Sequence, residues 1–550
     1  MTDGRNAGSS RPIERPGWGT FAALLAIVTV SGVFHLWGVR RDLPVLPQPD
    51  EIVLYQPAIR IASTGDLNPR WFGYPGSTVI YPTALAAHVW QAIVHDGGWL
   101  RVGSRWRSIL MGGGFELVLI GRLVSIAYSL SALVILFLVG RRVFDTRAAL
   151  VGALLAALCP TIVDYAQQLR TDGPAMLFGL LFLLCCLRLL ERPGWASSML
   201  AGAALGLAMA TRVMLAAAGP VLLVVDVVVW RRARRVHDRT RIWQLATGLA
   251  CVPVAFCVVT PYAVLEPETA WSSFRELAAK QTTHLGADGL GFAGNLWWYF
   301  STAMPIALTW PQMALALVGI AGVWRSRDPS ALLTVLYLTT FVGGISLVGL
   351  HWDRWLLPVL PLMALYAGYG ATLLVDAAVS VVGNRFWNPS SVRRWRLVPL
   401  LVAGLALVVV PTRSLVAAAR LHSVPTTEVV AAEWITANIP AKSLIARERG
   451  TAPISGWRYS LMTFPMLPRK TFDAYVRLQV DYVLASSSNW SRFQAEKARY
   501  PREVAFYEEL DRRAVLVKEF RPSADRGGPI VRVYALSPRA REVAASLGGR

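Results

Sequence analysis

The feature that most restricts the fold of this chain is a series of apolar segments, many of them close to twenty residues long. A helix of about twenty apolar residues crosses the hydrocarbon core of a bilayer. Hydrophobic residues make up 54% of the 550 residues and charged residues only 16%, which is little charge for the surface of a soluble protein. The sequence therefore predicts an α-helical polytopic membrane protein.

These apolar segments predict a bundle of about eleven transmembrane helices. They are 21–37, 115–139, 148–162, 173–190, 196–210, 213–230, 242–259, 296–323, 331–348, 356–375 and 397–410. The further segment 79–94 contains Pro82 and His88, and we expect it to lie at the membrane interface or to be re-entrant.

The connections between the segments alternate in charge. Arg141-Arg142, 231–241, 325–327 and 393–396 are rich in arginine, and the positive-inside rule places them in the cytoplasm. This predicts a cytoplasmic N-terminus and an extracytoplasmic C-terminus in a plasma membrane, with a bacterial inner membrane as the expected location. The net charge of +21 then reflects the membrane and not a nucleic acid partner.

Three regions follow from this topology. Residues 1–20 form a cytoplasmic tail, residues 21–412 a transmembrane domain with a first outer loop at 38–114, and residues 413–550 an extracytoplasmic α/β domain. Within the last region, strands are predicted at 443–446, 482–485, 514–520 and 530–536. The five cysteines all lie in apolar segments, so we expect small buried side chains and no disulfide framework.

An acidic pair, Asp50-Glu51, follows the first apolar segment and needs an explanation beside a membrane bundle. By itself such a pair could cap a helix of the outer loop. Downstream come Gly65-Asp66-Leu67-Asn68-Pro69 and then Tyr74-Pro75-Gly76. This order of motifs resembles the GT-C glycosyltransferases that use a polyprenyl-phosphate sugar, in particular the protein O-mannosyltransferases and the lipid A aminoarabinose transferases. Gly76 stands where those families have a second proline.

The resemblance implies a GT-C-like bundle that transfers one sugar from a polyprenyl-phosphate carrier to an acceptor hydroxyl on the extracytoplasmic side. Asp50 would be the general base, and Glu51 would orient the acceptor or Asp50. A carboxylate can take the proton of an attacking alcohol, and the phosphate leaving group needs no strong acid. One displacement would invert the anomeric carbon. The acceptor can be a protein, a lipid or a polysaccharide.

Three arginines on the same predicted side could contact the donor phosphate. They are Arg170, Arg212 and Arg354, the last within His351-Trp352-Asp353-Arg354 before a Leu-Pro-rich helix start. Arg170 could instead snorkel at a helix end, and Arg354 could pair with Asp353. Further residues expected at the substrate cavity are Asp66, Tyr74, Asp164, Tyr165, Asp172, His284, Trp297, Tyr299 and Asp353.

No cofactor is certain from the sequence. In some relatives a loop histidine and an acid of the first outer loop bind a metal, so the resemblance allows a divalent metal on Glu51 and His284. Two other functions fit the residues: a transporter of lipid-linked sugars, with intramembrane charge along its pathway, or a non-catalytic envelope assembly protein.

Overall fold

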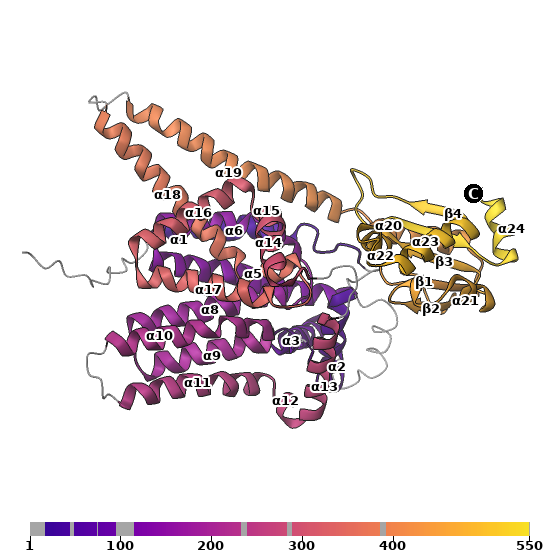
Figure 1. Cartoon of the computed structure of the whole chain (residues 1–550), viewed down its shortest axis with the longest axis horizontal. Helices are drawn as coiled ribbons and strands as arrows, with labels where there is room; N and C mark the ends of the chain where they lie inside the picture. The colour runs from indigo at the N-terminus through magenta and orange to yellow at the C-terminus, as the bar shows by residue number, and fades with distance from the viewer. Residues whose placement is uncertain are drawn as a thin grey trace, which may run out of the picture.

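The computed structural model consists of a helical bundle and a sheet domain, joined by the long helix α19 (Val392–His422) (Figure 1). It describes residues 17–43, 49–73, 75–94, 115–232, 239–282, 289–385 and 392–548. Within these ranges eight helices are long and apolar enough to cross a membrane, or up to ten if each of two bent pairs is one span. The predicted polytopic helical fold is confirmed, whereas the count of about eleven is not.

Most of the eight candidate spans lie side by side in the bundle, whereas α19 runs outside it toward the sheet domain (Figure 1). Seven of them lie in α1 (Trp18–Leu36), α5 (Phe115–Val143), α8 (Asp172–Glu191), α10 (Gly219–Arg232) with the turn before it, α11 (Arg239–Val259), α17 (Pro329–Ser346) and α18 (Leu360–Arg385). The eighth, Leu407–Asn438, combines the second half of α19 with the helix that follows it. The helix α9 (Trp195–Thr211) is apolar but shorter. It ends at Arg212, whose backbone is extended, before the 3-10 turn η2 (Val213–Ala218) that leads into α10.

Two of the predicted spans are bent in the structure. The first is α6 (Thr146–Ala157) with α7 (Pro160–Ala166), which bends by 58°. The second runs from α14 (Gly291–Trp298) through η3 (Tyr299–Ala303) and α15 (Met304–Ala307) to α16 (Trp310–Ser326), and bends by 118°. The cause is a new helix start, because Thr309 and Gln312 form a capping box.

Close helix packing in the bundle depends on small residues. Gly202 and Gly206 of α9 lie one turn apart and face α11, and a Cβ at either position would collide with backbone carbonyl oxygens of Gly248 and Val252. Small residues at this spacing let two membrane helices approach until their backbones touch. Together with the large buried cluster around α5, α8 and α18, this packing forms the core of the bundle.

Three helices that are not candidate spans lie at the end of the bundle nearest the sheet domain (Figure 1). They are α2 (Pro49–Thr64), α3 (Ser77–Val94) and α13 (Pro267–Thr282), which follows the short α12 (Tyr262–Leu265). Helix α3 contains the segment 79–94 and packs on α2 and α5. The acidic pair therefore starts a helix that rests on the bundle.

The C-terminal region is a five-stranded mixed sheet in the order β2-β1-β3-β5-β4. The strands are β1 (Leu444–Glu448), β2 (Ser460–Phe464), β3 (Tyr482–Ser486), β4 (Val515–Phe520) and β5 (Val531–Ala535). Strands β2, β1 and β3 are parallel, and β5 is antiparallel to β3 and β4. One face packs on α20 (Thr427–Asn438) and α24 (Pro538–Ser546). The other packs on η5 (Leu467–Arg469), α21 (Phe472–Arg477), α22 (Ser487–Ala495) and α23 (Pro501–Arg513).

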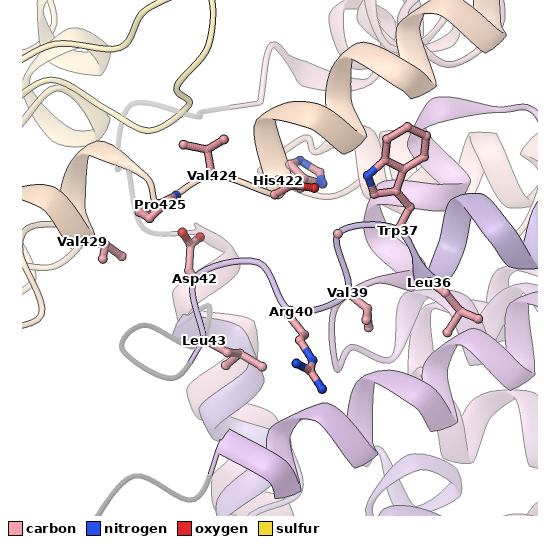
Figure 2. Close-up of a pocket in the computed structure, with 12 residues that line it drawn as sticks. Leu36, Trp37, Val39, Arg40, Asp42, Leu43, His422, Val424, Pro425 and Val429 are labelled. Carbon is pink, nitrogen blue, oxygen red and sulfur yellow. The ribbon is translucent and has the colours of Figure 1, made fainter.

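The bundle and the sheet domain meet around a cavity of about 500 Å³. Figure 2 shows it between the turns that follow α1, with Trp37 and Asp42, and the junction of α19 and α20, with His422 and Pro425. Next to it, Asp164 of α7 accepts a hydrogen bond of 3.1 Å from Arg41 and lies 3.5 Å from His422. These contacts tie the end of α19 to the ends of α1 and α7.

Candidate active site

Asp50 lies in the first turn of α2, between two arginines. Its Oδ2 accepts a hydrogen bond of 2.6 Å from Arg170 Nη1, and Arg354 Nη2 lies 3.5 Å from the same oxygen. Pro49 begins the helix and suits that position, and the free N–H groups of the first turn favour a negative charge. The Asp50 side chain remains 45% exposed, so a substrate can reach the carboxylate.

The two arginines come from distant parts of the chain and are held by aromatic neighbours. Arg170 lies in the turn between α7 and α8, where its Nε donates to Gln168 at 2.7 Å and its guanidinium lies 5.6 Å from the Tyr165 ring centre. Arg354 lies in η4 (Asp353–Leu356), with its guanidinium 4.7 Å from the centre of the Trp352 ring. The Tyr165 hydroxyl donates to Asp353 at 2.9 Å, which joins the two segments.

Glu51 has a different environment from its neighbour. Its side chain is fully buried, and both carboxylate oxygens accept hydrogen bonds of 2.8 Å from Arg122 of α5. A third bond comes from the backbone N–H of Leu169 at 2.9 Å, next to Arg170. Arg122 Nη1 also donates to the carbonyls of Val39 and Arg41. Glu51 thus fixes the start of α2 against the turn that presents Arg170.

Arg212 is buried and forms an ion pair with Asp172, the first residue of α8. Arg212 also lines a second cavity, of about 680 Å³, whose wall is mostly apolar. Met209, Val252, Phe256, Phe274 and Leu277 are among the apolar residues that line it. The cavity lies between α9, η2, α11, α13 and the loop around Pro75, and it has the room and the lining for part of a hydrocarbon chain.

The remaining predicted cavity residues are spread more widely. Asp66 pairs with Arg70 at 3.0 Å in an exposed loop beyond the far end of α2, roughly 20 Å along the helix from Asp50. Asp164 lies at the junction with α19, and Trp297 is exposed on α14. Tyr299 is completely buried in the bundle. Tyr74 and His284 lie outside the described residues.

The charge around Asp50 controls its ionisation. Burial raises the pKa of this carboxyl, but the positive charges of Arg170 and Arg354 outweigh burial, so the net pKa lies below its ordinary value. Asp50 is therefore a carboxylate at neutral pH, and it becomes more basic whenever the two guanidinium groups turn to another anion.

Comparison with known proteins agrees with this architecture. Residues 113–260 match the family model of dolichyl-phosphate-mannose-protein mannosyltransferases. A sequence comparison with curated proteins returned no match. Among solved structures, ArnT from Cupriavidus metallidurans bound to undecaprenyl phosphate is similar with a TM-score of 0.54 at 15% identity, over 94% of this chain and 98% of that chain. The apo state of ArnT gives a TM-score of 0.55.

Oligosaccharyltransferase AglB from Archaeoglobus fulgidus, in complex with an inhibitory peptide and a dolichol-phosphate, is similar with a TM-score of 0.53 at 13% identity. The match covers 95% of this chain and 74% of AglB. The protein has the GT-C fold. The resemblance to GT-C glycosyltransferases is thus confirmed by the segment 113–260, which matches a glycosyltransferase family, and by the fold of the whole chain.

Three further residues lie beside the predicted site residues, two in the bundle and one in the sheet domain. Arg122 is one of them; the sequence analysis does not single it out, although a signal existed, because a lone arginine within an apolar segment needs a buried partner. Trp352 is the second; the sequence analysis includes it in the motif His351-Trp352-Asp353-Arg354 but assigns it no role. Arg492 of α22 is the third, with its guanidinium 5.7 Å from the Trp352 ring centre. Nothing in the sequence of α22 predicts a contact between this helix and the bundle.

Of the two residues that the resemblance allows for a metal, only Glu51 lies within the described residues. Its carboxylate is buried, and both oxygens accept hydrogen bonds from the Arg122 guanidinium, so its charge is already paired with a cation. Within the described ranges, no group of three or more His, Cys, Asp and Glu side chains is arranged to hold a metal ion.

Proposed function

We propose that this protein transfers a single sugar from a polyprenyl-phosphate carrier to an acceptor hydroxyl on the extracytoplasmic side of a membrane. The observation that carries the proposal is the half-exposed Asp50 carboxylate between Arg170 and Arg354, which also feels the charge of Arg212 in the wall of the apolar cavity. A base, two phosphate ligands and room for a lipid are the parts that this reaction needs. Structures of the similar ArnT and AglB hold undecaprenyl phosphate and a dolichol-phosphate.

In the proposed reaction the acceptor oxygen attacks the anomeric carbon while the bond from that carbon to the phosphate oxygen breaks. The acceptor proton passes to Asp50, and the carrier leaves as polyprenyl phosphate. A single in-line displacement inverts the anomeric configuration. Arg170 and Arg354 would bind the donor phosphate, and the buried Arg212 would add positive charge from the cavity wall. As these two partly buried arginines turn to the phosphate, Asp50 becomes a stronger base.

Charge placement along the bundle supports the proposed orientation. Arg122 lies close to the Asp50-Glu51 pair, and Arg141 lies further along the same helix α5. Their separation of nineteen residues corresponds to about 28 Å, close to the thickness of the hydrocarbon core. If the Arg141-Arg142 end is cytoplasmic, then the candidate site and the sheet domain are extracytoplasmic, and so is the acceptor.

A transfer assay on purified protein tests the proposal. The protein in detergent is incubated with a radiolabelled polyprenyl-phosphate sugar and a membrane extract as the source of acceptors. We expect label in a new product without any transmembrane gradient. Movement of the intact lipid-linked sugar across a proteoliposome membrane, without cleavage of the donor, would instead establish the transporter alternative.

The pH dependence of the reaction provides a second prediction. Because the pKa of Asp50 is below its ordinary value, kcat/KM should not fall until the pH drops below the range of an ordinary aspartate, about 3.9. Arg170→Gln removes the nearer positive charge, so the pKa of Asp50 should rise and the acid limb should move to higher pH. The profile of kcat/KM against pH measures both. An unchanged limb in Arg170→Gln would contradict the assignment of that limb to Asp50.

A further inference from the structure

The sheet domain places one cation beside the bundle site. In α22, Trp490 and Phe493 are buried in the domain, whereas the Arg492 guanidinium reaches the Trp352 ring at 5.7 Å. The Arg354 guanidinium lies 4.7 Å from the centre of the same ring. Two guanidinium groups, one from each part of the protein, therefore share one indole.

This arrangement has more positive charge than its neighbours neutralise. Across the described part of the chain, Arg492 has no carboxylate within ion-pair distance, and Arg354 shares Asp50 with Arg170. Burial and the charge of Arg354 both lower the pKa of Arg492, which is the response of a cation in an unfavourable position. Contact with an indole offsets only part of this cost for each cation. Even with Asp353 counted, the three arginines leave a surplus positive charge.

We propose that Arg492 completes the donor-phosphate site, together with Arg354 and across the junction between the two domains. The proposal rests on the function proposed above and adds a residue of the sheet domain to it. A third cation does not stabilise a neutral acceptor hydroxyl. It does stabilise the phosphate, because the negative charge of the phosphate grows during the reaction from that of a diester to that of a monoester, which carries about −1.5 to −2 at pH 7. Arg492 then stabilises the leaving group more than the bound donor.

A structural consequence follows for the sheet domain. A phosphate held by Arg354 on one side and Arg492 on the other connects the bundle to α22 through charge-assisted hydrogen bonds. The carrier phosphate would therefore fasten the sheet domain over the site while it is bound, and release of polyprenyl phosphate would loosen that contact.

Binding of radiolabelled polyprenyl phosphate to the full-length protein in nanodiscs tests the proposal. We expect Arg492→Ala to weaken binding by about tenfold or more and to lower kcat, with Arg492→Lys intermediate, because one charge-assisted contact is lost or replaced. Arg499→Ala is the matched control, since Arg499 lies just beyond α22 and pairs with Glu496 at 3.7 Å. Unchanged thermal unfolding of the Arg492 variants shows that the domain is intact.

Two outcomes would overturn the proposal. One is wild-type affinity for polyprenyl phosphate in Arg492→Ala. The other is an effect restricted to the KM of the acceptor, which would make Arg492 a ligand of an acidic acceptor. The proposed function is tested separately, because it fails if the wild-type protein itself neither binds polyprenyl phosphate nor transfers sugar.

Discussion

Replacing Asp50 by asparagine is expected to lower kcat for sugar transfer by about 10²- to 10⁴-fold, the usual contribution of a general base. The amide has nearly the same shape, but it cannot accept the proton of the acceptor hydroxyl. Donor binding should be retained or become tighter, because Arg170 and Arg354 lose the carboxylate that competes with the phosphate. Single-turnover kinetics and binding of a polyprenyl phosphate separate the two effects.

A suitable control for Asp50→Asn is Asp376→Asn. Asp376 is an exposed carboxylate on α18 that also pairs with an arginine, Arg147 at 3.3 Å, far from Asp50 in the fold. Loss of an exposed pair of this kind changes stability little. If Asp50→Asn turns over at the rate of Asp376→Asn, then Asp50 is not the base.

The second large effect is expected at Glu51. Glu51→Met should destabilise the protein by about 3–5 kcal/mol, because it leaves the charge of Arg122 without its carboxylate partner. The Arg122 side chain is only 2% exposed, so water cannot replace that partner. It also removes the acceptor of the Leu169 N–H, so the turn that presents Arg170 loses its anchor. The loss of folded protein after heating, followed by size-exclusion chromatography, measures the first effect.

A double variant distinguishes a buried ion pair from simple packing. Glu51→Met combined with Arg122→Met removes both charges and should be less destabilised than Glu51→Met alone. Some cost will remain, because the Leu169 N–H and the carbonyls of Val39 and Arg41 lose their partner. The charge pairing contributes nothing if the double variant is destabilised as much as Glu51→Met alone. The same conclusion follows if its destabilisation is the sum of those of Glu51→Met and Arg122→Met. Activity should stay low in both variants, since the anchor of Arg170 is missing in each.

The bends show where reliance on apolar segments fails. The segment 296–323 is apolar almost throughout, so a search for segments of sufficient length predicts one transmembrane span. The chain instead restarts at Thr309, and Thr309-Trp310-Pro311-Gln312 carries the capping-box pattern with a proline in the first turn. The sequence therefore contains a local signal for a new helix start at Thr309. The prediction followed hydropathy instead, and hydropathy indicates burial in lipid but not the direction of a helix.

The sheet domain shows a second limit. Four of its strands were predicted from short apolar runs at 443–446, 482–485, 514–520 and 530–536, and the structure has strands at each of these places. Strand β2 was not predicted, because Ser460–Phe464 lies at the edge of the sheet and has an exposed or partly buried side chain at every position. Such a strand is formed by its pairing with β1, and its own residues do not predict that pairing.

The sequence by itself determined the polytopic helical class, the terminal α/β region and the acidic pair at Asp50-Glu51, because each depends on local composition or on motifs of neighbouring residues. Only the tertiary structure decided which environment each of the two carboxylates has. Glu51 is buried on Arg122, whereas Asp50 faces Arg170 and Arg354 and stays half-exposed. Adjacent residues at the start of a helix point in different directions, so packing, and not their chemistry, assigns one carboxylate to structure and leaves the other for the proposed reaction.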